Sequence, residues 1–156
     1  MSHTVSFFPR AVIETRRPPM GSNPQERVLI SIHDRSIGPA TLDENAWADV
    51  LRLQFDDRDV GDGELFASHH AQAVDAFVQK HAHVPHMVVH CTMGVSRSAA
   101  VALAIAQWPP GRRLYQQTRP VYNVFREVPN YNRHVYRTLL STWEEKMAPA
   151  SDPIAP

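Results

Sequence analysis

Hydrophobic residues occur along this chain in short blocks, and the spacing within each block indicates its secondary structure. Three blocks are apolar and rich in β-branched residues, as is typical of buried strands. They are RVLISIH (27–33), DVLRLQF (49–55) and HMVVH (86–90). A fourth block, TVSFF (4–8), has the composition of an edge strand. We therefore expect a sheet of about four to five strands.

Three further blocks have apolar residues at helical spacing and alternate with the strands. The segment 68–82 carries one apolar face and starts at Ser68, a good N-cap residue. The segment 98–108 is apolar on all sides, which predicts a buried helix, and PPG at 109–111 ends it. The segment 132–147 carries an apolar stripe. The apolar residues are Ala71, Val74, Phe77 and Val78 in the first block, and Val135, Leu139, Leu140 and Trp143 in the last.

Strands that alternate with helices predict an α/β fold with a mostly parallel central sheet and helices on both faces. A chain of 156 residues has the length of one domain, which we place at 1–147. The proline-rich segments at 16–26 and 148–156 are expected to be a loop and a disordered C-terminal tail. In parallel sheets, ligands bind where the carboxyl ends of strands meet helix N-termini. We therefore look for a functional site at that edge.

Composition narrows the classes of function. Sixteen basic and sixteen acidic residues cancel, which gives no general attraction to nucleic acid or to an anionic membrane. No apolar run approaches the roughly 18 residues that span a bilayer, and the N-terminus lacks the pattern of a secretory signal. The single cysteine cannot form an internal disulfide. We therefore expect a cytoplasmic protein that binds neither nucleic acid nor membrane.

The only cysteine, Cys91, lies in the segment HCTMGVSRS (90–98), between a predicted strand and a predicted helix. Most free cysteines are small buried hydrophobes. A loop that turns at Gly94 and enters a helix, however, can point successive backbone N–H groups inward and bind an anion, helped by the helix dipole. The same field stabilises a thiolate. Cys91 is thus a candidate nucleophile beside an anion-binding loop.

Three neighbouring side chains fit the same chemistry. Arg97 carries a planar pair of donors that matches two phosphate oxygens, which a lysine cannot do. Ser98 can place a hydroxyl beside the sulfur and stabilise it as a leaving group. His90 can hydrogen-bond to the backbone around the loop and fix its shape. Together they favour a nucleophilic cysteine over a packing residue.

These residues match H-C-x-x-G-x-x-R-S, and the segment resembles the motif of the cysteine-dependent protein tyrosine phosphatase superfamily. The SRS ending is similar to that of the dual-specificity subgroup, and compact bacterial members are also similar. The resemblance is specific over about 49–108. It implies a phosphatase-like fold, Cys91 as the nucleophile, and no metal or other cofactor. It also implies a phosphate-binding loop made of Thr92, Met93, Gly94, Val95, Ser96 and Arg97.

The resemblance further implies an aspartate general acid in a loop that follows another strand, upstream of the cysteine. The sequence LQFDDRDVGD (53–62) lies at that place. We favour Asp57, because strand alternation turns it to the same side as Leu53 and Phe55. Asp59 is the alternative. The full set of candidates is Asp56, Asp57, Asp59 and Asp62.

The expected function is hydrolysis of phosphomonoesters through a phosphocysteine, with a phosphorylated protein or peptide as substrate. Phosphotyrosine is expected to be accepted, and phosphoserine and phosphothreonine with it. The loop at 92–96 has no lysine, which disfavours inositol lipids as substrates. Two alternatives stay open: a catalytically silent phosphopeptide-binding module and a rhodanese-like sulfurtransferase.

Other polar clusters receive structural interpretations. The three histidines of HAHVPH (81–86) have no cysteine or carboxylate at ligand spacing, so we expect a solvated loop and no metal site. His33 and Asp34 are interpreted as a strand-terminating turn, with a role at the rim of the site as the alternative. Asn130 and Asn132 are interpreted as helix caps.

Overall fold

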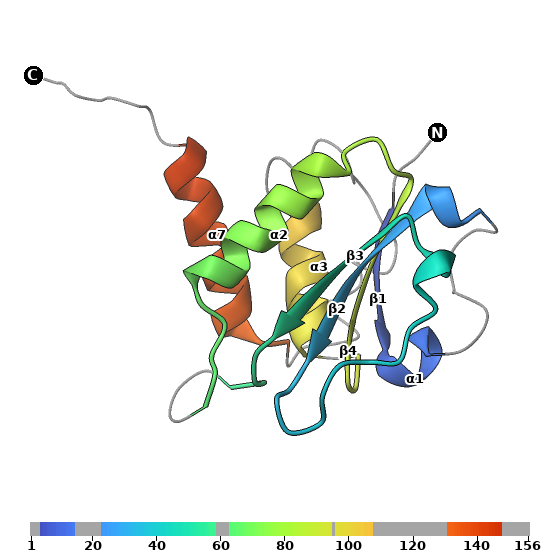
Figure 1. The fold of residues 1–156 in the computed structure, drawn as a ribbon. Helices are drawn as coiled ribbons and strands as arrows, with labels where there is room; N and C mark the ends of the chain where they lie inside the picture. The colour runs from blue at the N-terminus through green and yellow to red at the C-terminus, as the bar shows by residue number, and fades with distance from the viewer. Residues whose placement is uncertain (1–3, 15–22, 59–62, 95, 108–130, 148–156) are drawn as a thin grey trace, which may run out of the picture.

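The computed structural model describes residues 4–14, 23–58, 63–94, 96–107 and 131–147. Four parallel strands form one sheet in the order β1-β4-β2-β3 (Figure 1). They are β1 (Thr4–Pro9), β2 (Arg27–His33), β3 (Asp49–Gln54) and β4 (His86–Cys91). The expected α/β fold with a parallel sheet is confirmed. Each strand ends within one residue of its predicted bounds.

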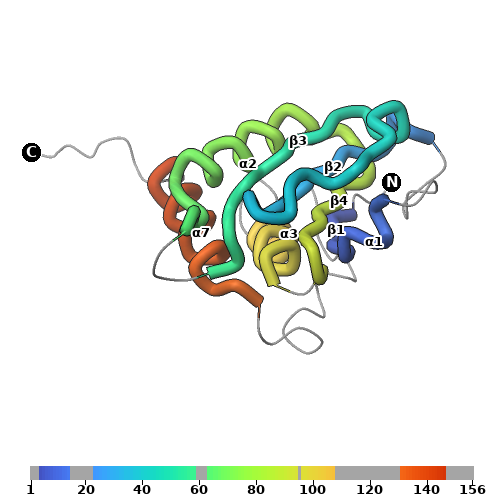
Figure 2. The backbone as a smooth tube through the Cα atoms, turned by 60° about the horizontal axis from the view of Figure 1, so that its bottom comes forward, coloured from blue at the N-terminus to red at the C-terminus, as the bar shows by residue number. Residues whose placement is uncertain are grey.

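Helices cover both faces of the sheet, as expected, but unequally (Figures 1 and 2). One face carries α2 (Ser68–Lys80), α3 (Arg97–Gln107) and α7 (Arg133–Met147). The other carries the short α1 (Arg10–Ile13). Two 3-10 turns, η1 (Pro24–Glu26) and η2 (Glu44–Ala46), lie in the connections before β2 and β3. The first falls within the segment 16–26 that was expected to be a loop.

Alternation along the strands divides the core into a large and a small part. Val28, Ile30 and Ile32 of β2 point into the large core, against the three long helices. Leu29 points the other way, into a small core that includes Trp47. Helix α3 is buried from Arg97 to Ile105, which explains why its sequence is apolar on all sides. The helix that follows the cysteine is therefore fixed firmly on the sheet.

Helices α2 and α7 are joined by a buried carboxylate, Asp75, which is 1% exposed. Trp143 donates its indole N–H to Asp75 Oδ1 at 2.7 Å, and Lys146 pairs with Oδ2. Burial alone would raise the pKa of Asp75, but the hydrogen bonds from Lys146, Gln79 and Trp143 outweigh it and hold that pKa below its usual value. This network fixes α7 against α2.

Two predicted details are wrong. Ser68 is not the N-cap of α2, because Ala67 occupies that position and donates its backbone N–H to His70 Nδ1 at 2.9 Å. His81 is not solvated: it is 8% exposed, and its Nε2 lies 2.9 Å from Asp49 Oδ2. For α2 the replacing contact comes from His70 in the first turn of the same helix, whereas for His81 it comes from Asp49 of β3.

Some predictions fall outside the part of the chain that the structure describes. They include the tail at 148–156 and residues 16–22 of the predicted loop. Within the described ranges, no helix combines the length and the hydropathy needed to cross a membrane.

Candidate active site

The loop between β4 and α3 requires a glycine at its centre. Gly94 has a φ of +72°, in the left-handed region that favours glycine. A Cβ at this position would overlap the backbone nitrogen of Pro9 and come within 2.7 Å of the carbonyl carbon of Phe8. The loop thus passes directly against the end of β1, which leaves no room for a side chain.

The loop wraps around the sulfur of Cys91. The N–H of Gly94 donates to Sγ at 3.3 Å, and the hydroxyl oxygen of Ser98 lies 3.1 Å from Sγ. Cys91 is 2% exposed and lies at the edge of the large core, beside the N-terminus of α3. These polar contacts to the sulfur distinguish Cys91 from a cysteine that packs only among apolar side chains. Val95, expected in the same loop, lies outside the described residues.

Arg97 begins α3 and is held from three directions, although it is only 4% exposed. Its Nη1 pairs with Asp34 and also donates to the carbonyl of Phe55 at 2.9 Å. Its Nη2 donates to Thr92 Oγ1 at 3.3 Å. Its Nε is buried and has no hydrogen-bond partner among the described residues. An unpaired buried donor costs about 1–3 kcal/mol, so this N–H is suited to an anion.

Asp34 is a site residue that the sequence interpretation placed in a turn. The turn is present, because Gly38 donates its N–H to the carbonyl of Asp34 at 2.9 Å. The carboxylate, however, pairs with Arg97 across the edge of the sheet. β2 lies beside β4, so the carboxyl ends of the two strands are neighbours. Sheet order brings Asp34 to the site, and no local sequence pattern gives that order.

Asp57 follows β3 and lies over the same loop. It is the middle residue of a tight turn in which the N–H of Arg58 donates to the carbonyl of Asp56 at 3.0 Å. Its Oδ1 accepts two hydrogen bonds, from Ser96 Oγ at 2.8 Å and from Asn132 Nδ2 at 2.9 Å. The side chain is exposed to solvent. Asp57, the favoured candidate general acid, is thus held beside the cysteine loop.

Asp56, unlike Asp57, makes its hydrogen bonds to the backbone of Glu64 and thereby closes the base of the loop that carries Asp57. Its Oδ2 accepts the N–H of Glu64 at 3.0 Å, and its own N–H donates to the carbonyl of Glu64 at 2.6 Å. Gly63 has a φ of +111°, and a Cβ there would overlap Asp56 Oδ2. Asp56 is therefore a structural residue. Asp59 and Asp62 lie outside the described residues.

Asn132 acts as the predicted helix cap and also contacts the site. Its Oδ1 accepts the N–H of Val135 at 3.0 Å at the start of α7. Its backbone N–H donates to the carbonyl of Ser96 at 3.2 Å. Its Nδ2 reaches Asp57, a contact that the capping interpretation did not include. Asn130 lies outside the described residues.

His90 is fully buried beneath the loop. Desolvation lowers its pKa to about 4, so the ring is neutral at neutral pH. Its Nδ1 lies 3.4 Å from the carbonyl oxygen of Cys91, and its Nε2 lies 2.6 Å from Ser31 Oγ. The neutral ring therefore donates from Nδ1 and accepts the Ser31 hydroxyl at Nε2. These two contacts tie the cysteine backbone to β2.

Solved structures share this architecture. The chain is similar to the human tyrosine phosphatase-like serine/threonine/tyrosine-interacting protein, with a TM-score of 0.55 and 18% identity, covering 78% of this chain and 79% of that one. It is also similar to Tk-PTP in its active form, with a TM-score of 0.50 and 18% identity, covering 78% and 80%. The chain has the tyrosine phosphatase fold. No family model and no curated protein sequence matches it.

In this phosphatase fold, a pocket of about 670 Å³ opens beside the cysteine loop. This volume is typical of small-molecule and side-chain binding sites. Two large apolar side chains are exposed in the loops at the same edge: Ile37 at 54% and Met93 at 71%. The pocket is lined by the loops after β2 and β3, with Asp34, Arg35, Ser36, Asp56, Asp57 and Arg58.

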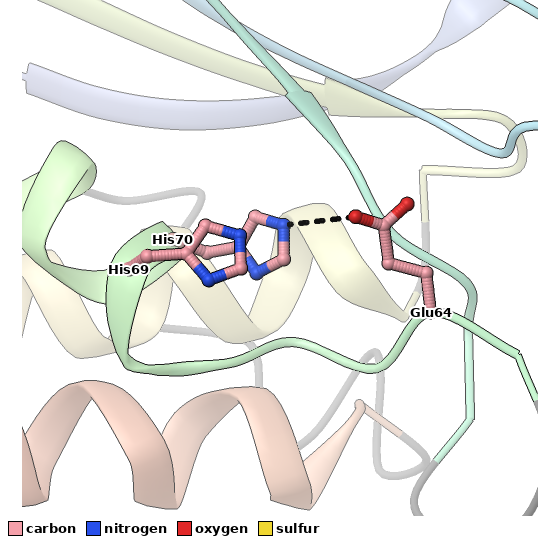
Figure 3. A group of neighbouring side chains, drawn as sticks. All are labelled: Glu64, His69 and His70. Carbon is pink, nitrogen blue, oxygen red and sulfur yellow. Dashed lines mark ion pairs between the residues drawn. The ribbon is translucent and has the colours of Figure 1, made fainter.

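A second polar cluster, made of Glu64, His69 and His70, has atoms close enough to hold a metal ion (Figure 3). Both ring nitrogens of His70 are nevertheless engaged. Nδ1 accepts the N–H of Ala67, and Nε2 donates to the carbonyl of Gln54 at 2.9 Å. Burial lowers the pKa of His70, which favours this neutral ring. A metal on either nitrogen would displace the hydrogen bond made there, so we interpret His70 as a structural link between β3 and α2.

Proposed function

We propose that this protein is a cysteine-dependent phosphatase that hydrolyses phosphorylated side chains of proteins or peptides. The observation that carries the proposal is the Arg97 guanidinium, which Asp34 and Phe55 fix while its buried Nε lacks a partner. A phosphate oxygen would supply that missing acceptor. The sulfur of Cys91, which accepts the N–H of Gly94 in the same loop, is the nucleophile.

In the first step, the Cys91 thiolate attacks phosphorus, so that an S–P bond forms while the bond to the leaving oxygen breaks. Arg97 and the backbone amides of 92–97 bind the non-bridging oxygens, where negative charge is concentrated. Asp57 donates its proton to the leaving oxygen. In this scheme Thr92, Met93, Gly94, Val95 and Ser96 serve as the phosphate-binding loop.

In the second step, Asp57 is a carboxylate and takes a proton from water. The water oxygen attacks phosphorus, and the S–P bond breaks to release phosphate and the thiolate. Ser98 donates a hydrogen bond to the departing sulfur, in keeping with its oxygen lying 3.1 Å from Sγ. His90 orients the cysteine through its contact with the Cys91 carbonyl. Neither step requires a metal or another cofactor.

The substrate class follows from the charge of the loop. Residues 92–96 include no lysine, which favours a single phosphate on a side chain over a polyanionic lipid. The exposed apolar side chains of Ile37 and Met93 suit an aryl phosphate. We thus propose phosphotyrosine as a substrate, with phosphoserine and phosphothreonine as further ones, and we keep the cytoplasm as the predicted location.

The test is release of phosphate from p-nitrophenyl phosphate and from phosphopeptides, with mass spectrometry of protein that has been denatured rapidly at alkaline pH, where the S–P bond survives. Wild type should turn over and accumulate a phosphate adduct on Cys91. Cys91→Ser should lose turnover, and Arg97→Lys should lose it by about 10²-fold or more, because lysine cannot form the bidentate contact. Full activity in Cys91→Ser would contradict the mechanism. An alkaline limb of the pH–rate profile that survives Asp57→Asn would move the general acid to Asp59.

The same experiment separates the alternatives. A silent phosphopeptide-binding module would bind phosphopeptide to the same loop and release no phosphate. A sulfurtransferase would transfer sulfur from thiosulfate and would be insensitive to Asp57→Asn. The position of Asp57, joined to the cysteine loop through Ser96, supports the hydrolase, because neither alternative needs a proton donor there.

A further inference from the structure

We propose that Asn132 and Ser96 are positioning residues that hold Asp57 by one oxygen and thereby assign its acidic proton to the other oxygen. The inference rests on the proposed hydrolase and names two residues that its chemistry needs. Both donors bind Oδ1, Ser96 at 2.8 Å and Asn132 at 2.9 Å. Within the described part of the chain neither donor binds Oδ2, and we assign Oδ2 to the leaving group.

The orientation of the Asn132 amide is fixed by its own surroundings. Its Oδ1 accepts the N–H of Val135, and only the oxygen of an amide can accept. Nδ2 must therefore be the atom that faces Asp57. The backbone of Asn132 is also bonded to Ser96, and the residue is 5% exposed. Because these two bonds hold it, Asn132 presents its N–H rigidly.

Two donors at Oδ1 decide where the proton of Asp57 resides. A proton on Oδ1 would meet the amide hydrogen of Asn132, which can only donate, and would force the Ser96 hydroxyl to turn round and accept. The proton is therefore carried by Oδ2 in the first step. After its transfer, the same donors stabilise the carboxylate that must accept a proton from water. One pair of contacts thus serves both halves of the reaction.

The backbone of the Asp57 loop does not depend on these donors. Asp56 and Glu64 close its base through two hydrogen bonds. Helix α7 is likewise held against α2 independently of Asn132, by the contact of Trp143 with Asp75. Removing the Asn132 amide should thus release the carboxylate of Asp57 without unfolding the loop or the helix.

Asn132→Ser is the matched variant, because serine is also a good N-cap but is too short to reach Asp57. With phosphoserine and phosphotyrosine peptides, whose leaving oxygens need a proton, we expect kcat/KM to fall about 10-fold, a part of the 10²–10⁴ that general acids contribute. With p-nitrophenyl phosphate, whose leaving group is a stable anion, the fall should be less than about 3-fold. Ser96→Ala should show the same dependence on the leaving group. In an Asp57→Asn background, Asn132→Ser should have no further effect.

Asn132→Asp keeps the cap and places a carboxylate against Asp57. Asp57 should then hold its proton to higher pH, and the alkaline limb of the rate profile should move upward, further than in Asn132→Ser. Among the described residues, the charged groups that line the same pocket as Asp57 are Asp34, Arg35, Asp56 and Arg58, with Arg97 paired to Asp34, and the variants leave them unchanged. A profile that does not move would overturn the proposal.

A measurement that does not depend on turnover tests the positioning role of Asn132 separately from the proposed hydrolase activity. In wild type, the side-chain NH₂ resonance of Asn132 should titrate with Asp57 in ¹H–¹⁵N spectra, and the titration should vanish in Asp57→Asn. Its absence in wild type would overturn the positioning role even in an inactive protein. Turnover in wild type with equal losses for all leaving groups in Asn132→Ser would refute the inference and leave the hydrolase intact. Titration without turnover would support the contact and refute the hydrolase.

Discussion

The ion pair between Asp34 and Arg97 gives the sharpest test of how this site is built. Arg97 is 4% exposed, and the side chain of Asp34 is 23% exposed, so the pair lies between a buried bridge and a surface bridge. Breaking a fully buried pair costs about 3–5 kcal/mol, whereas a surface pair contributes about 0–1 kcal/mol. For Asp34→Ala we expect a loss of about 1–3 kcal/mol. Because Phe55 still accepts from Nη1, the loss should stay within that range.

Asp34→Asn separates charge from hydrogen bonding. The amide keeps an acceptor oxygen for Arg97 but removes the negative charge, so its cost should be smaller than that of alanine. A loss of about 1 kcal/mol lowers the Tm of a domain of this size by about 2–4 °C. Both variants should also lower kcat/KM, alanine more than asparagine, because Arg97 is held less firmly.

Inorganic phosphate provides the deciding assay. A bound phosphate dianion pairs with the Arg97 charge that the variants leave uncompensated. The rise in Tm on adding saturating phosphate should therefore be larger in Asp34→Asn than in wild type. Ser36→Ala, on the same pocket wall, is the control and should behave as wild type, since Ser36 is exposed. Wild-type stability and activity in Asp34→Ala would refute the reasoning.

Three further predictions concern the frame of the site. Gly94→Ala should destabilise the protein and abolish phosphate binding, because the added Cβ would overlap β1. Gly38→Ala is the control: Gly38 has a φ of +81° but open space around it, so the free energy of unfolding in urea should fall by only about 1 kcal/mol. His90 has a pKa of about 4 in the folded protein and 6.5 in the unfolded chain, so it is neutral in the folded protein at neutral pH. The free energy of unfolding should therefore fall by roughly 3 kcal/mol as the pH drops from 6.5 towards 4. A His90→Gln variant should lack this loss. Asp75, whose folded pKa lies below the usual 3.8, stabilises above that pH and loses its contribution as the pH falls through the folded value. Asp75→Asn should therefore be less stable than wild type at neutral pH, as Lys146 loses its charged partner, and the gap in urea midpoint should close in acid.

Much of the fold was predictable because buried parallel strands have continuous runs of apolar residues in the sequence. β2 (Arg27–His33) has every residue buried, and its predicted bounds match the observed ones. The segment from Cys91 to Ser98 was also predictable, since its glycine, arginine and serine are placed by a single turn. Such local signals need no knowledge of what lies across the molecule.

The remaining site residues depend on tertiary placement. Asp34 reaches Arg97 because β2 and β4 are neighbours, yet the two strands are far apart in the chain and their order is not encoded locally. Asn132 lies 75 residues from Asp57, and only the docking of α7 brings them together. Ser68 was assigned as an N-cap from its type alone, and the ring of His70 took over the bond at that end of the helix.

The polar contacts of the site serve structure and chemistry at once, and this decides which substitutions are informative. Asp34 closes the turn after β2 through its backbone carbonyl and fixes Arg97 through its carboxylate, whereas the side chain of Asn132 both caps α7 and binds Asp57. An alanine at position 132 removes two functions together, so a loss of activity would not identify its cause. Asn132→Ser keeps the cap and removes the contact to Asp57, whereas Asp34→Asn keeps the turn and an acceptor oxygen for Arg97 and removes the negative charge. Losses that follow these conservative variants, and that depend on the leaving group or on bound phosphate, report on the chemistry itself.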